Sequence, residues 1–209
     1  PRLGGIEQDV TVFFSDIRQF SMISEKLSDS EKLVELLNAY LYPMTINIVD
    51  KQEGTLDKYI GDAIMAFWGA PGSWPPEEHA IAACKSALQQ LRILESEVNG
   101  WILEKRKEDA DYPINRLDIG IGIHSGLATI GNMGSEGRKN YTAMGDPVNL
   151  ASRLEGVNKA YGTRIIISNE TRQRIQSEPF VVRELDTIQV IGRMEGETIF
   201  ELVDYEGEL

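Results

Sequence analysis

The sequence predicts an α+β domain with a ferredoxin-like core, an antiparallel sheet with helices packed on it. Apolar residues alternate with other residues near 10–14 and 117–123, which is the period of a strand. Between these segments lie two longer ones with apolar residues at helical spacing, separated by two short strand-like runs. The resulting order β-α-β-β-α-β is typical of a ferredoxin-like unit, which has its helices on one face of the sheet.

The N-terminal half supplies the first four of these elements. Residues 1–8 are expected to be a linker from an upstream region, and 9–16 to form the first strand. Capping residues from Ser28 onward predict a helix start, and Pro43 is expected to kink that helix. Two short strands then form a hairpin around residues 61–62. The helix carries apolar residues at helical spacing, namely Leu33, Leu37, Tyr40, Met44 and Ile48.

The second half completes the core and adds a C-terminal αβαββ extension. Pro75–Glu78 predict the start of a helix that continues to about Lys107, with acidic residues where the helix dipole favours them. One domain is expected over 9–203, followed by a tail at 204–209. The remaining elements are strands at 117–123 and 127–132, a helix at 146–161, a strand at 164–167, a helix at 169–176 and strands at 181–190 and 198–202.

The composition argues against some classes of protein. With 209 residues, 42% of them hydrophobic, the chain can bury a substantial core. The formal net charge of −12 argues against a nucleic-acid-binding surface, which needs clustered Lys and Arg. Cys84 is the only cysteine, so no disulfide can form within the chain. This fits a reducing compartment and a buried structural thiol.

The first residue of the chain and its hydropathy bear on its cellular location and on whether it is part of a longer protein. The sequence contains no apolar stretch long enough for a membrane span and no signal peptide. It begins with Pro1 rather than Met, so we expect a part of a longer polypeptide. The expected location is cytoplasmic, as the catalytic part of a full-length protein that is either soluble or anchored in a membrane.

Two aspartates stand at the ends of apolar strands. Asp16 follows the alternating residues 10–14, and Asp62 directly precedes the apolar run 64–67. A carboxylate at a strand end is held rigidly and still meets solvent, as a metal ligand must. Two of them on neighbouring strands would hold a pair of divalent cations. The alternative is that both aspartates only close β-turns, where Asp beside Gly is common.

Four motifs follow one another along the chain, at Phe14–Ser21, Asp57–Ala63, Ile121–Gly126 and Gly145–Arg153. In this combination the chain closely resembles the catalytic domain of the class III nucleotidyl cyclases, the adenylyl and guanylyl cyclases, and in particular the bacterial type. The resemblance covers nearly the whole sequence. It implies a metal-dependent phosphoryl-transfer site, which agrees with the reading of the two aspartates.

The resemblance assigns the metal and phosphate ligands. It implies that Asp16, Asp62 and the carbonyl of Ile17 bind two divalent cations, Mg²⁺ or Mn²⁺. One cation would activate the ribose 3′-hydroxyl, and the other would hold the triphosphate and stabilise the departing pyrophosphate. The backbone amides around Phe20 and Ser21 would help to cradle phosphate oxygens.

The resemblance also assigns residues to the nucleotide. Asn149 and Arg153 lie four residues apart and so share one helix face, which by spacing alone would be a solvated face. The resemblance implies instead that Asn149 orients the ribose and that Arg153 stabilises charge on the α-phosphate. Lys58 stands where guanylyl cyclases usually carry glutamate, and its ammonium can only donate, which suits N1 of adenine. Thr142 would accept from the adenine amino group. Lys58 and Thr142 therefore favour ATP.

Two positions depart from the family pattern. Ile191 stands where a lysine usually binds the triphosphate, and Arg193, two residues further on, is the candidate replacement. Gln19 stands where glycine is usual, and it is strained if its φ is positive. Of the two histidines, His124 is expected to be structural, with a hydrogen-bond partner, and His79 to lie at the surface.

The function implied by the resemblance is that of an adenylyl cyclase, a phosphorus-oxygen lyase of signal transduction that converts ATP to 3′,5′-cyclic AMP and pyrophosphate. Its sites would form in a homodimer, with the metal aspartates on one chain and Lys58, Thr142, Asn149 and Arg153 on the other. An upstream regulatory or sensor domain is the further expected partner. The alternatives are a guanylyl or dual-specificity cyclase and, because of Ile191, a catalytically weak nucleotide-binding regulatory domain.

Overall fold

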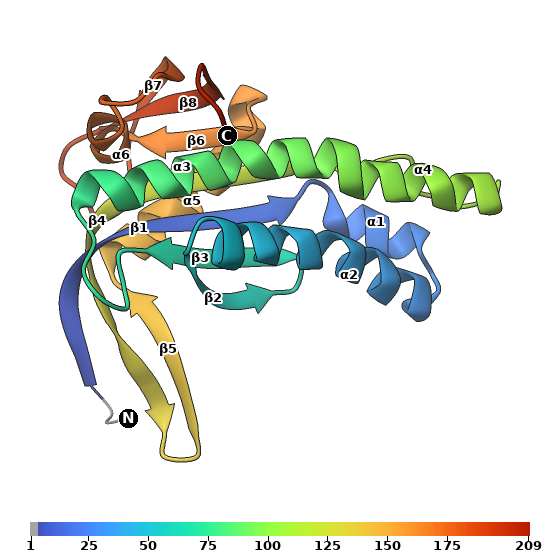
Figure 1. The fold of residues 1–209 in the computed structure, drawn as a ribbon, viewed down its shortest axis with the longest axis horizontal. Coiled ribbons are helices and arrows are strands. Elements are labelled where there is room, and N and C mark those ends of the chain that lie inside the picture. The colour runs from blue at the N-terminus through green and yellow to red at the C-terminus, as the bar shows by residue number, and fades with distance from the viewer. Residues whose placement is uncertain (1–3) are drawn as a thin grey trace.

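The computed structural model describes residues 4–209, which form one sheet with helices packed against it (Figure 1). The strands are β1 (Gly4–Ile17), β2 (Thr55–Ile60), β3 (Ala63–Trp68), β4 (Ile119–Ser135), β5 (Arg138–Met144), β6 (Ile165–Ser168), β7 (Phe180–Ile188) and β8 (Glu197–Tyr205). The helices are α1 (Phe20–Lys26), α2 (Ser30–Ile46), α3 (Pro76–Ile93), α4 (Asn99–Glu108), α5 (Asp146–Tyr161) and α6 (Asn169–Arg174), with the π-helical turns η1 (Asn47–Lys51) and η2 (Leu94–Val98).

The strands of the described residues lie in the order β2-β3-β1-β4-β6-β8-β7, with β5 paired to β4. Their pairings are antiparallel except that of β4 with β6. The first four strands therefore lie side by side as β4-β1-β3-β2, connected by helices after β1 and β3. This confirms the predicted α+β class and its ferredoxin-like core.

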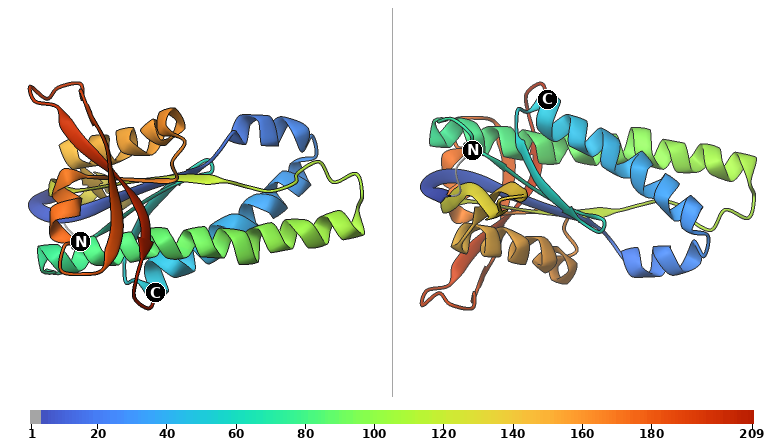
Figure 2. Two further views of the ribbon diagram at one scale, coloured as in Figure 1. Left: turned by 90° about the horizontal axis from the view of Figure 1, so that it is seen from above. Right: turned by 90° about the horizontal axis from the view of Figure 1, so that it is seen from below.

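Side chains alternate between two cores along β1. Phe13 packs with Tyr40 of α2 and Ala83 of α3 in the main core. Val12 points to the other face of the sheet and packs in a cluster with Ala151 of α5. Figure 2 shows α3 and α5 on opposite sides of the sheet. Helices thus cover both faces, not the one face of a simple ferredoxin-like unit, because the C-terminal extension supplies α5.

The helix α5 lies directly against β4. A Cβ atom at Gly122 would lie 2.2 Å from the backbone nitrogen of Glu155, so a side chain at this position would push the helix away from the strand. The helix itself begins with Pro147 in its first turn and ends at Gly162, whose φ is 61°. These local signals explain why α5 has the predicted bounds.

The N-terminal end and the middle of the sheet differ from expectation. Gly4–Gln8, expected as linker, form the start of β1 and pair with Ala128–Asn132 of β4, while residues 1–3 lie outside the described part. β4 is one strand where two were predicted, and β5 forms with it an unpredicted hairpin that extends away from the sheet (Figure 1). Gly4–Gln8 and residues 133–144 are rich in glycine and polar residues, so they lack the alternation that predicts strands.

The long helices follow the prediction closely. Pro43 lies inside α2, which passes into η1, and α3, η2 and α4 succeed one another up to Glu108. β8 runs to Tyr205, so the first two residues of the expected tail belong to the sheet. Over residues 4–209, none of the helices has the length and apolar character needed to cross a membrane.

The cysteine and one histidine lie inside α3. Cys84 is buried as predicted, and burial raises the pKa of its thiol. The predicted surface position of His79 is wrong, because this side chain is fully buried. Its Nδ1 lies 2.7 Å from Oγ1 of Thr11, and its Nε2 lies 3.0 Å from Oδ2 of Asp9. The acidic neighbours of His79 lie on the exposed side of the same helix turn, which conceals the burial in the sequence.

Candidate active site

Asp16 and Asp62 come together at one end of the sheet. β1 and β3 are paired up to Ser15 and Ile64, so the end of β1 lies beside the turn that precedes β3. Oδ2 of Asp62 accepts a hydrogen bond of 2.8 Å from the backbone N–H of Ile17. The turn itself requires Gly61, whose φ is 62°. The two carboxylates therefore lie on neighbouring strands, in the arrangement that the sequence predicts.

The positive charges that act on these carboxylates are those of Arg18 and Lys159. Nη1 of Arg18 lies 3.7 Å from Oδ1 of Asp16 and 3.4 Å from Oε1 of Glu155. Burial raises the pKa of Glu155 to about 8, and the neighbouring Asp16 adds to this effect. Burial, assisted by the charge of Asp16, also raises the pKa of Asp62 against the effect of its hydrogen bond from Ile17. Three acidic groups thus gather here, an environment that favours bound cations.

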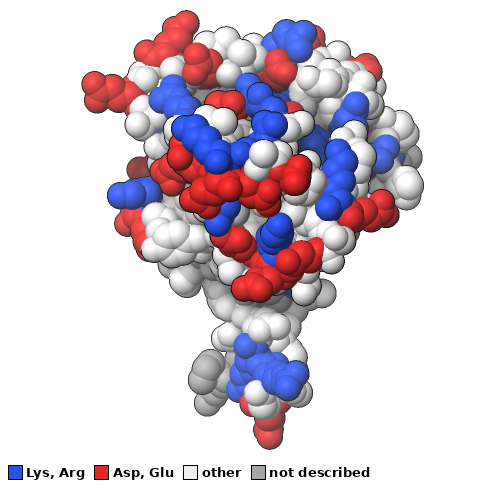
Figure 3. All heavy atoms as spheres, turned by 90° about the vertical axis from the view of Figure 1, so that its right-hand side faces the viewer, with Lys and Arg blue, Asp and Glu red and all other residues white. Residues whose placement is uncertain are grey.

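One oxygen of Asp16 suits a metal ligand. Oδ1 is buried and receives no hydrogen bond within residues 4–209. Buried carboxylate oxygens normally have a partner, and hard divalent cations prefer oxygen ligands. The residues present therefore fit the pair of cations that the resemblance implies. Figure 3 views the end of the molecule toward which β1 runs, and both acidic and basic side chains lie on that face.

The loop after β1 leads into the short helix α1. Gln19 precedes this helix with a φ of 54°, so the expected positive φ is confirmed and the glutamine is strained by a modest amount. Phe20 is half-buried and Ser21 is exposed in the first turn. Their backbone amides lie at the start of a helix close behind Asp16 in the chain, where amides can receive phosphate oxygens.

Lys58 and Thr142 both contact Asp57, a residue for which no role was predicted. Oγ1 of Thr142 donates to both carboxylate oxygens of Asp57, at 2.9 and 2.7 Å, and the Ala143 N–H donates to Oδ2 at 3.0 Å. Nζ of Lys58 lies 3.7 Å from Oδ1. Because the Thr142 hydroxyl donates its proton to Asp57, its oxygen lone pairs remain free to accept a hydrogen bond.

Asn149 and Arg153 are exposed on α5. Glu155, which approaches Arg18 and Asp16, lies two residues beyond Arg153, or about 200° around the helix. Arg153 therefore points away from the carboxylates of its own chain. Within one chain the predicted site residues form separate groups, with the metal ligands at the end of β1 and the ribose and α-phosphate ligands on the outer face of α5.

Arg193 and Ile191 lie in the loop before β8. Nη1 of Arg193 donates to Oε2 of Glu197 at 2.9 Å, and Nη2 donates to Oδ2 of Asp146 at 2.5 Å. Ile191 is fully exposed. Arg193 is thus held by two carboxylates, which a phosphate would have to replace.

His124 is buried on β4, and its Nδ1 lies 2.7 Å from Oγ of Ser168. Burial lowers the pKa of His124 to about 4, so the imidazole is neutral near pH 7. The predicted hydrogen-bond partner of His124 is therefore confirmed. Glu170 also lies 3.8 Å from Nδ1, a neighbour that the spacing along the sequence did not indicate.

Residues 6–202 match the sequence model of the family described as the adenylate and guanylate cyclase catalytic domain. Among curated relatives, the terminal-differentiation-specific adenylate cyclase of Dictyostelium discoideum is 37% identical over 204 residues, and adenylate cyclase 1 of Rhizobium meliloti is 36% identical over 196 residues. The alignments cover 96% and 94% of this chain but only 9% and 28% of those proteins.

Two solved structures are similar over almost their whole length. The adenylyl cyclase CyaB from P. aeruginosa has a TM-score of 0.82 and 34% identity, with 99% of this chain and 100% of that chain covered. The guanylyl cyclase Cya2 has a TM-score of 0.84 and 30% identity, with 97% and 95% covered. Both nucleotide specificities thus occur on closely similar folds.

Proposed function

The chain belongs to the family of adenylate and guanylate cyclase catalytic domains, and we propose that it is an adenylyl cyclase that converts ATP to 3′,5′-cyclic AMP and pyrophosphate. The main support for ATP as the substrate is that Lys58 and Thr142 lie close together, since both contact the carboxylate of Asp57. An ammonium group can donate to N1 of adenine, and the threonine oxygen can accept from the exocyclic amino group. Guanine presents the opposite pattern, since its N1 is protonated.

The site residues would divide the chemistry among them. Asp16, Asp62 and the carbonyl of Ile17 would hold two divalent cations, Mg²⁺ or Mn²⁺, which supply Lewis-acid activation of the 3′-hydroxyl and neutralise phosphate charge. The amides around Phe20 and Ser21 bind the phosphates. Oδ1 of Asp16 receives no hydrogen bond within residues 4–209, although it lies 3.7 Å from Nη1 of Arg18, and this supports the assignment.

The remaining groups act on the nucleotide from α5 and the C-terminal loop. Asn149 orients the ribose, so that the 3′-hydroxyl faces the α-phosphate, and the guanidinium of Arg153 stabilises the charge that develops there. Arg193 is a further candidate for the triphosphate, provided that phosphate replaces Asp146 or Glu197. Ile191, which stands where a lysine usually binds the triphosphate, keeps open the alternative of a weakly active regulatory domain.

We propose that two copies of the chain complete each site. Arg153 points away from Asp16 of its own chain, so a two-fold partner is needed to bring the two groups together. Each chain carries both groups, and a homodimer would contain two equivalent sites. The single buried Cys84 fits a reducing compartment, which supports a cytoplasmic location. An upstream regulatory domain, whose presence would agree with the length of the relatives, would act by changing how the two copies close.

Incubating the purified chain with Mn²⁺ and either ATP or GTP, and identifying the product by mass, tests this function. Cyclic AMP from ATP is the expected product. Across a dilution series, the activity per chain should fall as the dimer dissociates, because a single chain lacks a complete site. Cyclic GMP alone would refute the choice of ATP, and constant activity per chain during dissociation would refute the shared site.

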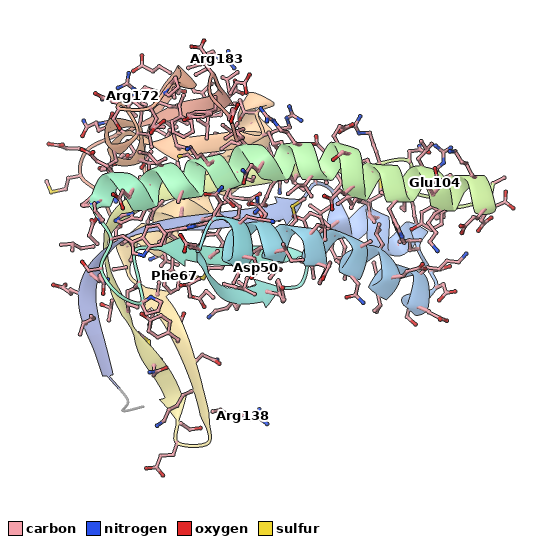
Figure 4. All side chains as sticks on the ribbon, viewed as in Figure 1. Asp50, Phe67, Glu104, Arg138, Arg172 and Arg183 are labelled. Atoms are coloured by element: carbon pink, nitrogen blue, oxygen red, sulfur yellow. The ribbon has the colours of Figure 1, made fainter. Side chains whose placement is uncertain are left out.

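Lys58→Glu is expected to lower the ratio of kcat/KM for ATP to that for GTP by about tenfold or more, since a hydrogen bond from a charged donor contributes about 1.5–3 kcal/mol. The new carboxylate would also lie beside Asp57. Lys107→Glu is the matched control, because Lys107 is exposed and pairs with Glu104 on α4, away from the site (Figure 4). An unchanged ratio in Lys58→Glu would show that base selection lies elsewhere.

A further inference from the structure

A second group of possible metal ligands lies apart from Asp16 and Asp62. His124 on β4, Glu170 in the first turn of α6 and Glu197 at the start of β8 each offer one ligand atom, and these atoms lie within 4.8 Å of one another. The three residues come from elements that are distant in the sequence. Their convergence depends on the pairing of β6 with both β4 and β8.

Two oxygens in this cluster lack partners. Glu197 is only 6% exposed, and its Oε1 is buried without a hydrogen bond in the described part of the chain. The same holds for Oε2 of Glu170, the oxygen that lies 3.8 Å from Nδ1 of His124. Leaving buried carboxylate oxygens unpaired is costly. Burial and the neighbouring Glu170 raise the pKa of Glu197 to about 7, so a proton shared by the two carboxyl groups is the alternative to a ligand bound between them and the imidazole.

The charges around the cluster favour a cation. Arg193 donates to Oε2 of Glu197 and to Asp146, so one guanidinium serves these two carboxylates while Glu170 lies beside them. Arg174 also acts on His124 but is paired with Asp9, so Arg193 is the cation shared by the carboxyl groups of Asp146, Glu170 and Glu197. When these three groups are all ionised, their charge exceeds that of Arg193. Either a shared proton or a bound cation must compensate this excess.

We propose that His124, Glu170 and Glu197 bind a divalent first-row transition-metal ion, with Zn²⁺ as the best-matched probe. One imidazole nitrogen and two carboxylate oxygens are ligands that zinc accepts, whereas Mg²⁺ and Ca²⁺ prefer oxygen alone. A pocket of about 680 Å³, lined by Glu170, Glu197 and the loop that carries Arg193, opens beside the cluster. It leaves an access route and room for a water molecule as the fourth ligand.

The ion would tie three elements together. It would link β4 to the start of α6 and the start of β8, and so stabilise the C-terminal part of the sheet. Arg193 extends the connection to Asp146 in the first turn of α5. This binding does not depend on the proposed cyclase activity, because none of the three ligands belongs to the Asp16–Asp62 pair; the cluster shares only Arg193 and its partner Glu197 with the proposed triphosphate contact.

Calorimetric titration of the whole chain with Zn²⁺, in excess Mg²⁺ to occupy the Asp16–Asp62 pair, tests the proposal. One Zn²⁺ per chain is expected, together with a rise in thermal midpoint. Glu197→Gln should weaken this binding by about tenfold or more, since loss of groups that only orient metal ligands already costs about 10–100-fold. Glu195→Gln is the matched control, because Glu195 is exposed and lines the same pocket.

Two further measurements separate this site from others. Asp62→Ala should bind Zn²⁺ as tightly as the unaltered chain, and Co²⁺ bound to the unaltered chain should give the visible absorption of a site with a nitrogen ligand. The proposal is overturned if the unaltered chain binds no Zn²⁺, which would mean that Glu170 and Glu197 only share a proton. Equal binding by folded Glu197→Gln, or loss of binding in Asp62→Ala, would also overturn it.

Discussion

Asp62→Ala is expected to abolish cyclic AMP formation, with a loss in kcat/KM of at least about a thousandfold, or about 4 kcal/mol. The physical reason is that Asp62 would be one of two carboxylates that hold the catalytic cations. Its side chain lies at a turn and is only partly buried, and its contact with the protein is the hydrogen bond from Ile17. Losing that bond costs about 1 kcal/mol of stability, so the fold should survive.

Initial rates with Mn²⁺ and ATP, measured beside circular dichroism of the same samples, check this prediction. Asp111→Ala is the matched control, because Asp111 is exposed in the loop after α4 and its loss should leave the rate unchanged. Substantial activity in folded Asp62→Ala would rule out its role as a metal ligand.

Arg153→Ala is expected to be nearly inactive as well, by about a hundred- to a thousandfold, because one donor that stabilises transition-state charge has this effect. Mixing it with Asp62→Ala should restore activity. In a mixed dimer, one site takes its aspartates from the Arg153→Ala chain and its arginine from the Asp62→Ala chain, so that site is intact. The other site of the same dimer carries both substitutions.

The recovery has a defined size. If equal amounts of the two variants reassort at random, half of the dimers are mixed and each has one working site, so about a quarter of the unaltered activity should return. Mixing Asp16→Ala with Asp62→Ala is the control, because both substitutions affect the metal ligands and every site is defective. Activity that stays absent although mixed dimers form would contradict a site shared between chains.

The helices and hairpins that could be predicted are those with a capping or turn residue at their ends. The bounds of α5 follow from Pro147 at its start and Gly162 at its end, and the hairpin of β2 and β3 follows from Gly61. The hairpin of β4 and β5 has no comparable signal. Its strands carry glycine and polar residues, and their pairing with each other and with Gly4–Gln8 is a long-range contact.

In the candidate site, too, the residues within sequence motifs were predicted, whereas the contacts between distant residues were not. The motifs named Asp16 and Asp62, and the pairing of β1 with β3 explains why the two lie together. The role of Asp57 was not predicted, because its contact with Thr142 joins residues 85 positions apart. The burial of His79 was not predicted for a related reason, because its partners Asp9 and Thr11 lie on β1, far from His79 in the sequence.

The α+β class, the long helices, the family and the residue types available for metal and nucleotide binding could all be predicted from the sequence. These depend on periodicity, capping and motifs, which are properties of neighbouring residues. The contacts of Arg193 with two carboxylates, and the approach of His124 to Glu170 and Glu197, became apparent from the three-dimensional structure alone. Such contacts join residues far apart in the chain, and their geometry is set by sheet pairing and close packing, which no local pattern encodes.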